Sequence, residues 1–509
     1  MFYLLKILVQ IKLLTFRRLF FFIQSLLQDS FNLLGLLNYI CKISPNSVAL
    51  DLPDQQITYK KLYSDCHSIA LSLQQNYGLK KGDKVAVLCR NHQACVQSII
   101  SLSALGIHIY LLNVEMHVMQ LKKIIDTHTF NFIIYDEEKE VDLDQLHVEN
   151  KILAAHTFKD SITQFVKNKS QSTQKIKSVR SGKIIVLTGG SSGNFKTAER
   201  KPSILNFSHP LAELLIKLKL HTYDSVYIAT PIYHGYGFSA LITSLLLGKR
   251  IFLRERFSTQ ESTSLTEKNK IEVLVLVPIM LQRMLICAPE SFQHVQCILS
   301  GGALIDPALV VKTASIAGDK LFNLYGSSEA GFSILATPSD LKRYPATIGK
   351  PIHGVDVKIT NNKREVATGE VGMICIKCRW VMDSLSDQWA ETGDLGFKNK
   401  DGYIFLRGRK DNMIISGGEN VYPEEVESIL LEHEYIQQAA VIGVSDESFG
   451  QRLKAFVVQK EHACLSEKLL LAWLQTKVAR YQMPAQIILV ESIPMLETGK
   501  LNTKELLNF

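Results

Sequence analysis

A short loop rich in glycines and hydroxyl groups, and ending in a lysine, lies near residue 190 of this 509-residue chain. It follows the apolar run 184–187 and comprises Thr188, Gly189, Gly190, Ser191, Ser192, Gly193 and Lys196. Glycines let backbone N–H groups approach a phosphate closely, hydroxyls add hydrogen-bond donors, and lysine supplies positive charge. The loop is not a P-loop, because that pattern needs a Gly-Lys pair and here Phe195 precedes Lys196. The predicted ligand is a polyphosphate.

Four later segments carry further side chains that could act on a nucleotide. Residues 323–329 offer an aromatic ring to stack on adenine, a hydroxyl for the α-phosphate and a carboxylate for the Mg²⁺ that bridges phosphates. Residues 391–396 hold a Gly-Asp turn, 414–427 hold two adjacent glycines, and 494–501 hold a lysine in a turn. Each segment alone is a common turn. The prediction of a nucleotide site therefore depends on all of these segments occurring in this order along the chain.

This series, over residues 188–500, resembles the motifs of the acyl-adenylate-forming (AMP-binding) superfamily, of the acyl- and aryl-CoA ligase type. The resemblance covers roughly residues 32–509, including 57–62 and 106–113. The chain departs from the family pattern at three positions in phosphate-contacting segments. Gly189 replaces a serine, Phe195 a proline and Ser328 a threonine.

The resemblance implies a role for each matching residue. Lys500 would bridge the substrate carboxylate and the α-phosphate, Glu329 would hold Mg²⁺, and Lys196 with its loop would hold the outer phosphates; these three are the implied catalytic residues. Besides the loop, the implied ATP/AMP site comprises Gly301, Gly302, Asn323, Tyr325, Gly326, Ser328, Asp394 and Arg409. Tyr233, His234, Gly235, Gly417 and Gly418 would line the acyl pocket and the CoA channel. Asp411 would be the hinge about which the C-terminal domain rotates.

The implied reaction is ATP-dependent conversion of a carboxylic acid to an acyl-adenylate, followed by transfer to the thiol of CoA, with Mg²⁺ as the metal. The apolar N-terminus mildly favours a fatty acid. An aryl acid, or a free acyl carrier protein as the acceptor, stays open. The competing hypothesis is a degenerate relative without catalysis, because of the departures at Gly189, Phe195 and Ser328. Against it, Lys196, Glu329, Asp394, Arg409 and Lys500 are all present.

The composition is that of an ordinary globular protein, with 46% hydrophobic and 21% charged residues. A net charge of +8 suits anionic substrates such as ATP and CoA, and no Lys/Arg-dense tract with interleaved aromatics points to nucleic acid. The nine cysteines are scattered, which predicts reduced thiols in a cytoplasmic protein. Cys375 and Cys378 are predicted to be plain strand residues rather than a metal-binding pair.

Residues 1–28 are apolar but interrupted by Lys6, Lys12, Arg17 and Arg18. The longest uncharged window, 19–28, is shorter than the roughly 20 residues of a membrane span. The apolar stretch is not followed by a small-residue cleavage site, so we do not expect a cleavable signal peptide. Two alternatives stay open: a segment that lies peripherally on the cytoplasmic membrane surface, or a helix packed on the protein itself.

The elements that must position these side chains alternate short apolar runs with helical stretches, which predicts an α/β fold. We expect strands at 85–88, 132–135, 184–187, 226–229, 273–277, 297–299 and 321–324, and helices at 60–75 and 117–126. The expected organisation is an N-terminal segment 1–30, a large N-terminal domain over 31–408 with mixed sheets and helices in layers, and a small mobile α+β lid over 409–509.

Overall fold

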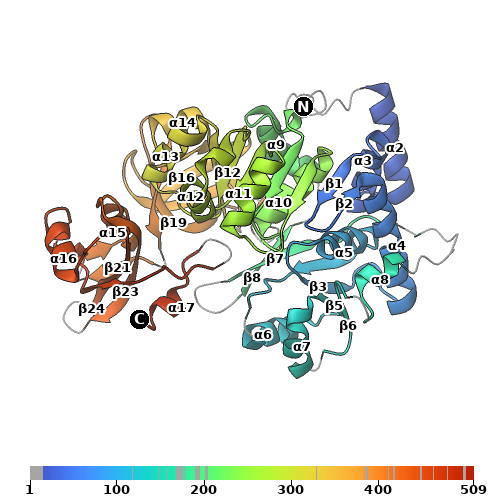
Figure 1. The fold of residues 1–509 in the computed structure, drawn as a ribbon, viewed down its shortest axis with the longest axis horizontal. Helices are drawn as coiled ribbons and strands as arrows, with labels where there is room; N and C mark the ends of the chain where they lie inside the picture. The colour runs from blue at the N-terminus through green and yellow to red at the C-terminus, as the bar shows by residue number, and fades with distance from the viewer. Residues whose placement is uncertain are drawn as a thin grey trace.

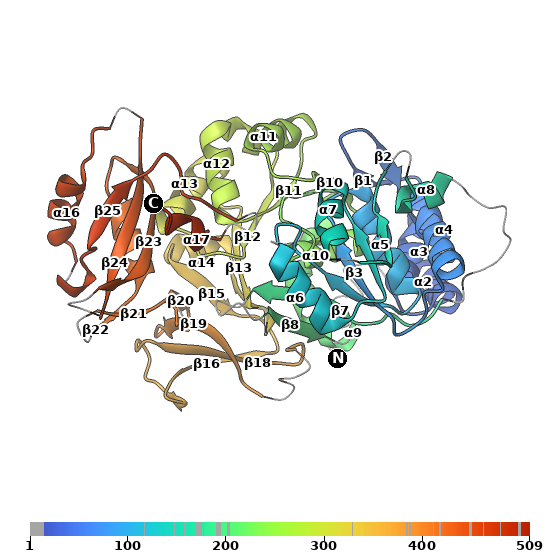
Figure 2. The ribbon, with the colours of Figure 1, turned by 90° about the horizontal axis from the view of Figure 1, so that it is seen from below.

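The structure is a computed structural model that describes residues 15–509 apart from 117, 147, 157–158, 168–175, 177, 190–194, 201–203, 328, 383–384, 386–387, 411, 417–418, 447–449, 462, 479 and 497–499. Three β-sheets with helices packed on them form a large N-terminal part and a small C-terminal part (Figure 1). Seen from below, the C-terminal part with α16 and β25 lies at one end of the molecule and α4 lies near the other (Figure 2). Across the described residues, we find no helix with the length and hydropathy of a membrane span.

A six-stranded sheet in the order β6-β5-β3-β4-β7-β8 forms the N-terminal end of the large part. Its strands are mostly parallel and buried, as the continuous Val/Ile runs require, and β8 is antiparallel to β7. The strands are β3 (Lys84–Leu88), β4 (His108–Leu111), β5 (Phe132–Tyr135), β6 (Lys151–Leu153), β7 (Ile184–Gly189) and β8 (Phe195–Arg200). The helices in this stretch of chain are α2 (Phe16–Asp29), α3 (Leu33–Ile43), α4 (Tyr59–Tyr77), α5 (Gln93–Ala104), α6 (Val118–His128), α7 (Glu140–Gln145) and α8 (Ile162–Lys167).

A 14-stranded sheet passes through the middle of the molecule in the order β17-β16-β18-β19-β20-β15-β14-β13-β12-β11-β9-β10-β1-β2. Its strands are β1 (Val48–Asp51), β2 (Gln56–Thr58), β9 (Ser225–Ile228), β10 (Arg250–Leu253), β11 (Val273–Leu276), β12 (Cys297–Gly301), β13 (Leu321–Ser327), β14 (Gly331–Ala336), β15 (Thr347–Pro351), β16 (Val355–Asn361), β17 (Arg364–Glu365), β18 (Gly372–Cys378), β19 (Ala390–Lys398) and β20 (Ile404–Arg409). Its helices are α9 (Ile204–Ile216), α10 (Gly235–Leu246), α11 (Thr259–Lys268), α12 (Pro278–Cys287), α13 (Pro307–Ala317) and α14 (Pro338–Arg343). The parallel strands β9 to β13 end at one edge, where α/β proteins place their ligands.

The C-terminal part is a five-stranded sheet with its own apolar core. Its elements are β21 (Ile414–Ser416), β22 (Glu419–Val421), α15 (Pro423–Leu431), β23 (Ile436–Asp446), β24 (Gly450–Gln459), α16 (Glu467–Gln475), β25 (Gln486–Leu489) and α17 (Thr503–Leu506). Val426 and Leu430 of α15 and Leu470 and Leu474 of α16 are fully buried in that core.

The fold class predicted from the sequence is confirmed, and all the expected strands and helices are present with bounds that differ by a few residues. Several strands extend further than expected: β7 continues through Thr188 and Gly189, β12 through Gly301 and β13 through Ser327. Strand β20, which ends at Arg409, was not among the expected strands. The domain boundary after residue 408 stays a prediction, although Lys410 still donates its N–H to the Gly393 carbonyl of the large sheet (2.8 Å).

Glu427 on α15 should make the stability of the C-terminal part depend on pH. Burial raises the pKa of Glu427 from 4.5 to about 8, although the Val441 N–H donates to its carboxyl group (2.7 Å). A raised folded-state pKa means that its stabilising contribution is complete below pH 4.5 and is lost as the pH rises through 8. We therefore expect the C-terminal unfolding transition to move to lower temperature between pH 6 and pH 9, measured by calorimetry.

The Glu427→Gln variant should flatten this pH dependence, because the amide cannot ionise. Glu434→Gln is the matched control, since Glu434 is exposed. An unchanged slope in the Glu427→Gln protein would show that another group causes the pH dependence.

Candidate active site

A cavity of about 2590 Å³ is lined by residues of both the N-terminal and the C-terminal parts of the chain. The large sheet contributes the ends of β12, β13, β19 and β20 to its wall, and the C-terminal part contributes α15, β23 and the segment that carries Lys500. The cavity has room for a nucleotide together with an acid, since single-ligand pockets measure about 300–1,000 Å³.

Asp394 is the centre of a polar cluster on one wall of the cavity. It lies directly across from Arg409 in the antiparallel pair β19–β20, and its Oδ1 accepts a hydrogen bond from Arg409 Nη1 (2.9 Å). Its Oδ2 accepts from the Tyr325 hydroxyl at the end of β13 (2.6 Å). Gly393 has φ +80°, and a Cβ there would meet Arg409 Nη2 at 2.6 Å, so the missing side chain makes room for the guanidinium group.

The carboxylate of Asp394 can accept further hydrogen bonds. Burial raises its pKa, while the hydrogen bond from Tyr325 and the positive charge of Arg409 act in the opposite direction. Because each carboxylate oxygen has two lone pairs, Asp394 can still accept from two ligand hydroxyls. Tyr325 is nearly buried, and desolvation and the nearby Asp394 raise its pKa, so it remains a neutral donor.

Lys500 reaches the same cavity from the C-terminal part. A tight turn carries it: Met495 pairs with Leu501, and the Leu496 N–H donates to the Lys500 carbonyl (2.8 Å). Desolvation and the charge of Arg409 lower the pKa of Lys500, whereas Asp394 and Glu329 act to raise it. The Lys500 side chain is exposed to solvent, but it lies in the wall of the cavity, where the surrounding protein removes part of its hydration. Four of the predicted site residues, Glu329, Asp394, Arg409 and Lys500, thus line one cavity.

Glu329 provides the carboxylate that a divalent cation would need. It lines the cavity after β13, and the Met382 N–H donates to its backbone carbonyl (2.9 Å), which fixes the chain at this point. Mg²⁺ in nucleotide sites is commonly held by one or two carboxylates together with phosphates and water, so Glu329 fits this role. The metal would neutralise charge on the phosphates when bound.

Of the predicted adenine and pocket-floor residues, Gly302, Asn323 and Gly326 line the cavity, whereas Gly301 is not part of its lining. The Asn323 amide is held against the Thr347 carbonyl (3.4 Å). A Cβ on Gly301 would meet the Leu324 carbonyl at 2.9 Å and the Tyr236 ring at 3.5 Å. Gly326 is equally tight, because its Cβ would meet the Gly331 carbonyl at 2.6 Å. The backbone therefore needs glycine at both positions.

His234 precedes α10 and lines the cavity, as do Gly235 and Tyr236. Its Nε2 is buried and has no hydrogen-bond partner, so a ligand atom could supply one. Burial, helped by the positive charge of Lys500, lowers the pKa of His234 to about 4, which keeps the imidazole neutral. Tyr233 is buried behind it, with ring centroids 4.6 Å apart.

The phosphate loop is shorter than predicted. Thr188 pairs with Lys196 and Gly189 with Phe195 in the antiparallel β7–β8 hairpin, because these residues continue the two strands. Gly190, Ser191, Ser192, Gly193, Ser328, Asp411, Gly417 and Gly418 lie outside the described residues, so their predicted roles stay predictions. Gly417 and Gly418 fall between β21 and β22.

Sequence reasoning missed Asn91, a buried residue between β3 and α5. Its Nδ2 donates to the Thr230 carbonyl (3.0 Å), and its Oδ1 accepts from the Ile232 N–H (2.7 Å). It thereby joins the six-stranded sheet to the segment that leads into His234. An Asn after a strand is a common turn residue, so the sequence holds no distinguishing signal.

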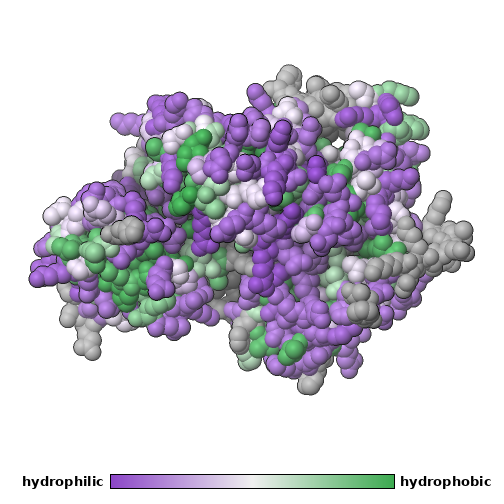
Figure 3. Space-filling view, in the orientation of Figure 1, coloured by the Kyte–Doolittle hydropathy of each residue, from purple (hydrophilic) through white to green (hydrophobic). Residues whose placement is uncertain are grey.

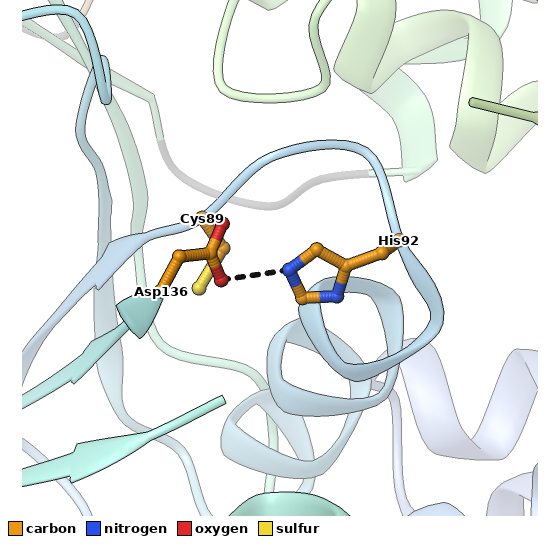
Figure 4. Close-up of side chains that lie close together, drawn as sticks. All are labelled: Cys89, His92 and Asp136. Atoms are coloured by element: carbon orange, nitrogen blue, oxygen red, sulfur yellow. Dashed lines mark hydrogen bonds and ion pairs between the residues drawn. The ribbon is translucent and has the colours of Figure 1, made fainter. Parts of the chain in front are cut away.

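The loop that carries Asn91 is fixed by its neighbours Cys89, His92 and Asp136 (Figure 4). His92 caps α5, since its Nδ1 accepts from the Cys95 N–H (3.3 Å), and its Nε2 lies 2.7 Å from Asp136 Oδ1. The three side chains are close enough to suggest metal ligands. However, an Nδ1 that accepts requires the proton on Nε2, where it is donated to Asp136. We therefore assign the cluster a structural role.

Replacing Asn91 by Ala should weaken use of the acid more than use of ATP. The change leaves the buried Thr230 carbonyl and Ile232 N–H unpaired, at about 1–3 kcal/mol each, and frees the segment before His234. We expect kcat/KM for the acid to fall about tenfold or more while the Kd of ATP stays within twofold. Asn131→Ala is the control, because exposed Asn131 only accepts from the Lys84 N–H (2.8 Å). Equal losses for both substrates would indicate general destabilisation.

Comparison with known proteins identifies the family of this chain. Residues 39–385 match the model of the AMP-binding enzyme family, and residues 425–500 match that of the AMP-binding enzyme C-terminal domain. The chain therefore belongs to the AMP-binding enzyme family.

Its relatives include a 2-succinylbenzoate–CoA ligase of Bacillus pumilus (strain SAFR-032), 28% identical over 481 residues, which span 91% of this chain and 95% of the relative. Among solved structures, o-succinylbenzoate CoA synthetase from Bacillus subtilis with its acyl-adenylate intermediate has a TM-score of 0.79 at 25% identity, covering 92% of this chain and 97% of that one. The same synthetase with ATP and a magnesium ion has a TM-score of 0.78 at 25% identity, covering 92% and 98%. The sequence-based predictions of family, of an AMP-forming acid–thiol ligase, and of ATP, Mg²⁺ and CoA are confirmed.

Proposed function

We propose that the protein joins an aromatic carboxylic acid to CoA through an acyl-adenylate, and that 2-succinylbenzoate is the first candidate acid. The observation that carries the adenylation chemistry is the convergence of Lys500 with Asp394, Arg409, Tyr325 and Glu329 on one cavity. Their residue types match the needs of a nucleotide: acceptors for ribose, cations for phosphate and a carboxylate for the metal.

We assign the following roles to these residues. Asp394 holds the ribose hydroxyls, the Tyr325 ring stacks near the base, and Arg409 and Lys500 face the α-phosphate and the substrate carboxylate. Their positive charges offset the charge that develops as pyrophosphate leaves, and holding both reactants in line removes much of the entropic cost. Neutral His234, whose buried Nε2 has no hydrogen-bond partner and which lines the cavity, would accept a hydrogen bond from the pantetheine of CoA or donate one to it.

The identity of the acid is supported by the relatives and by the pocket floor. The chain spans nearly the whole of a 2-succinylbenzoate–CoA ligase. Tyr236 lines the cavity, and its hydroxyl donates to the Leu299 carbonyl (2.9 Å), which holds the ring in the wall where an aromatic ring of the acid could pack against it. The mild preference for a fatty acid drew only on the apolar N-terminus, and no comparison supports it. The relatives also give no support for a carrier protein.

A panel of acids tests this proposal. Pyrophosphate release is measured with 2-succinylbenzoate, benzoate, 4-coumarate, octanoate and palmitate, each with and without CoA, and thioester formation is followed by mass spectrometry. We expect release and thioester with 2-succinylbenzoate above all others. Release with the fatty acids alone would overturn the aryl assignment. Acyl transfer only to a carrier protein would show that CoA is not the acceptor. If no acid gives pyrophosphate release, the protein would be a degenerate relative without catalysis.

A further inference from the structure

Helix α2 turns its apolar side chains outward. Phe16, Phe20, Ile23 and Leu27 are 88%, 54%, 50% and 83% exposed. They are four, three and four residues apart, so they share one face of the helix. Leu19 extends this face, and we call the five residues the α2 stripe. In Figure 3, hydrophobic side chains are visible at the upper right edge, where Figure 1 places α2.

The side of α2 that faces the protein carries both apolar and polar residues. Phe21 and Phe22 are partly buried against the core, and Ser25 and Asp29 are the fully buried residues of the helix. Asp29 Oδ2 accepts from Asn38 Nδ2 (2.5 Å) and from the Tyr63 hydroxyl (3.0 Å). These hydrogen bonds fix which side of α2 faces the protein. The exposed stripe is therefore a consequence of specific contacts, and a rotation that buried it would leave Asp29 without its partners.

The charged residues of the sequence up to residue 28 are all basic. They are Lys6, Lys12, Arg17 and Arg18, and there is no acidic residue before Asp29. Arg17 is exposed, with its guanidinium 5.5 Å from the Phe21 ring centroid. An apolar helical face with basic residues beside it is the pattern of helices that lie in a membrane interface.

We propose that the α2 stripe docks this enzyme onto an anionic lipid surface, with α2 lying in the plane of the interface. The stripe enters the boundary between head groups and acyl chains, and the basic side chains pair with lipid phosphates. Binding of this kind is reversible, and it needs neither the acid nor ATP. It is therefore independent of the proposed function.

Two other occupants are less suited to the stripe. A second copy would bring two basic helices together, and their like charges would repel. Residues 1–14 could cover it, but besides the Tyr3 hydroxyl they contain only Lys6, Gln10 and Lys12 as polar side chains. A cover made of that segment would itself present apolar side chains to the outside, so the lipid surface would still be the preferred partner.

Vesicle sedimentation with the full chain tests this proposal. The vesicles contain either phosphatidylcholine alone or phosphatidylcholine with phosphatidylglycerol, in low and high salt. We expect binding to the anionic vesicles, weaker binding to the neutral ones, and weakening by salt. The double variant Phe20→Ser/Leu27→Ser should lose about a hundredfold in vesicle affinity, about tenfold for each side chain withdrawn from the lipid.

The matched control is Val311→Ser/Leu469→Ser, which changes two apolar residues of α13 and α16 that are 59% and 60% exposed. It should bind vesicles like the unaltered protein, and both variants should keep the same ligase activity. Equal vesicle binding by the stripe variant and the control would overturn the proposal. So would a dimer in light scattering that the stripe variant converts to a monomer, with no vesicle binding, because the occupant would then be a second copy. If neither vesicle binding nor a dimer is found, residues 1–14 would be the occupant of the stripe, and the proposal would also be overturned.

Discussion

Lys500→Ala should lower the rate of adenylation by at least about a hundredfold while leaving transfer from the adenylate to CoA nearly unchanged. Lys500 is the cation that the C-terminal part brings to the cavity beside Asp394 and Glu329. Loss of one donor that faces developing charge typically costs about 10²–10³ in rate. If Lys500 acts only in the first step, acyl-AMP supplied from outside should still give thioester. The two half-reactions are measured separately, by pyrophosphate release and by CoA thioester formation.

Lys504→Ala is the control for this variant, because Lys504 lies four residues further on and lines the same cavity. It should adenylate at the normal rate. The pH profile gives a second check. Desolvation lowers the pKa of Lys500, and adenylation needs its protonated form. The rate of adenylation should therefore fall with rising pH at a pH below 10.5, the ordinary pKa of lysine. Equal loss of both half-reactions would contradict a role confined to adenylation.

Asp394→Asn should raise the KM for ATP about a hundredfold. The amide keeps the shape of the side chain but has no negative charge, so it loses the charge-assisted bonds to the ribose hydroxyls and the ion pair with Arg409 (2.9 Å). Two hydrogen bonds to a charged group together contribute about 3 kcal/mol, which corresponds to about two orders of magnitude. Affinity for AMP, measured by calorimetric titration, should fall by a similar factor.

The chain contains a matched control for this substitution. Asp401 also accepts from an arginine and a tyrosine, Arg343 Nη2 (2.8 Å) and the Tyr344 hydroxyl (2.6 Å), but it is exposed and does not line the cavity. Asp401→Asn should leave nucleotide affinity unchanged. An Asp394→Asn protein that binds AMP normally would rule out the proposed ribose contact.

Much of the site could be predicted because its residues stand in short motifs whose order is readable. Asp394 and Arg409 illustrate this, since β19 and β20 form an antiparallel pair that places them opposite each other. The extent of β7 and β8 could not be predicted, because a run of glycines and hydroxyls has low strand propensity and only its pairing with the partner strand extends it.

Long-range contacts account for what the sequence does not disclose. Asn91 acts through the backbone of Thr230 and Ile232, which are far away in the sequence. The orientation of α2 has the same origin. Its periodicity shows that one face is apolar, but the contacts of Asp29 with Asn38 and Tyr63, together with the packing of Phe22 on Tyr39, decide that this face points outward.

The distribution of thiols provides a test for the predicted rotation of the C-terminal part. None of the nine cysteines, all of which lie among the described residues, forms a disulfide; Cys287 and Cys464 are exposed, Cys41 is partly covered and the other six are buried. Cys287 ends α12 in the large part, whereas Cys464 precedes α16 in the C-terminal part. Because the two exposed thiols lie on different parts of the chain, maleimide dyes would form a donor–acceptor pair without any engineered cysteine. A change in energy transfer between them as ATP, the acid and CoA are added in turn would indicate that the C-terminal part moves relative to the large part.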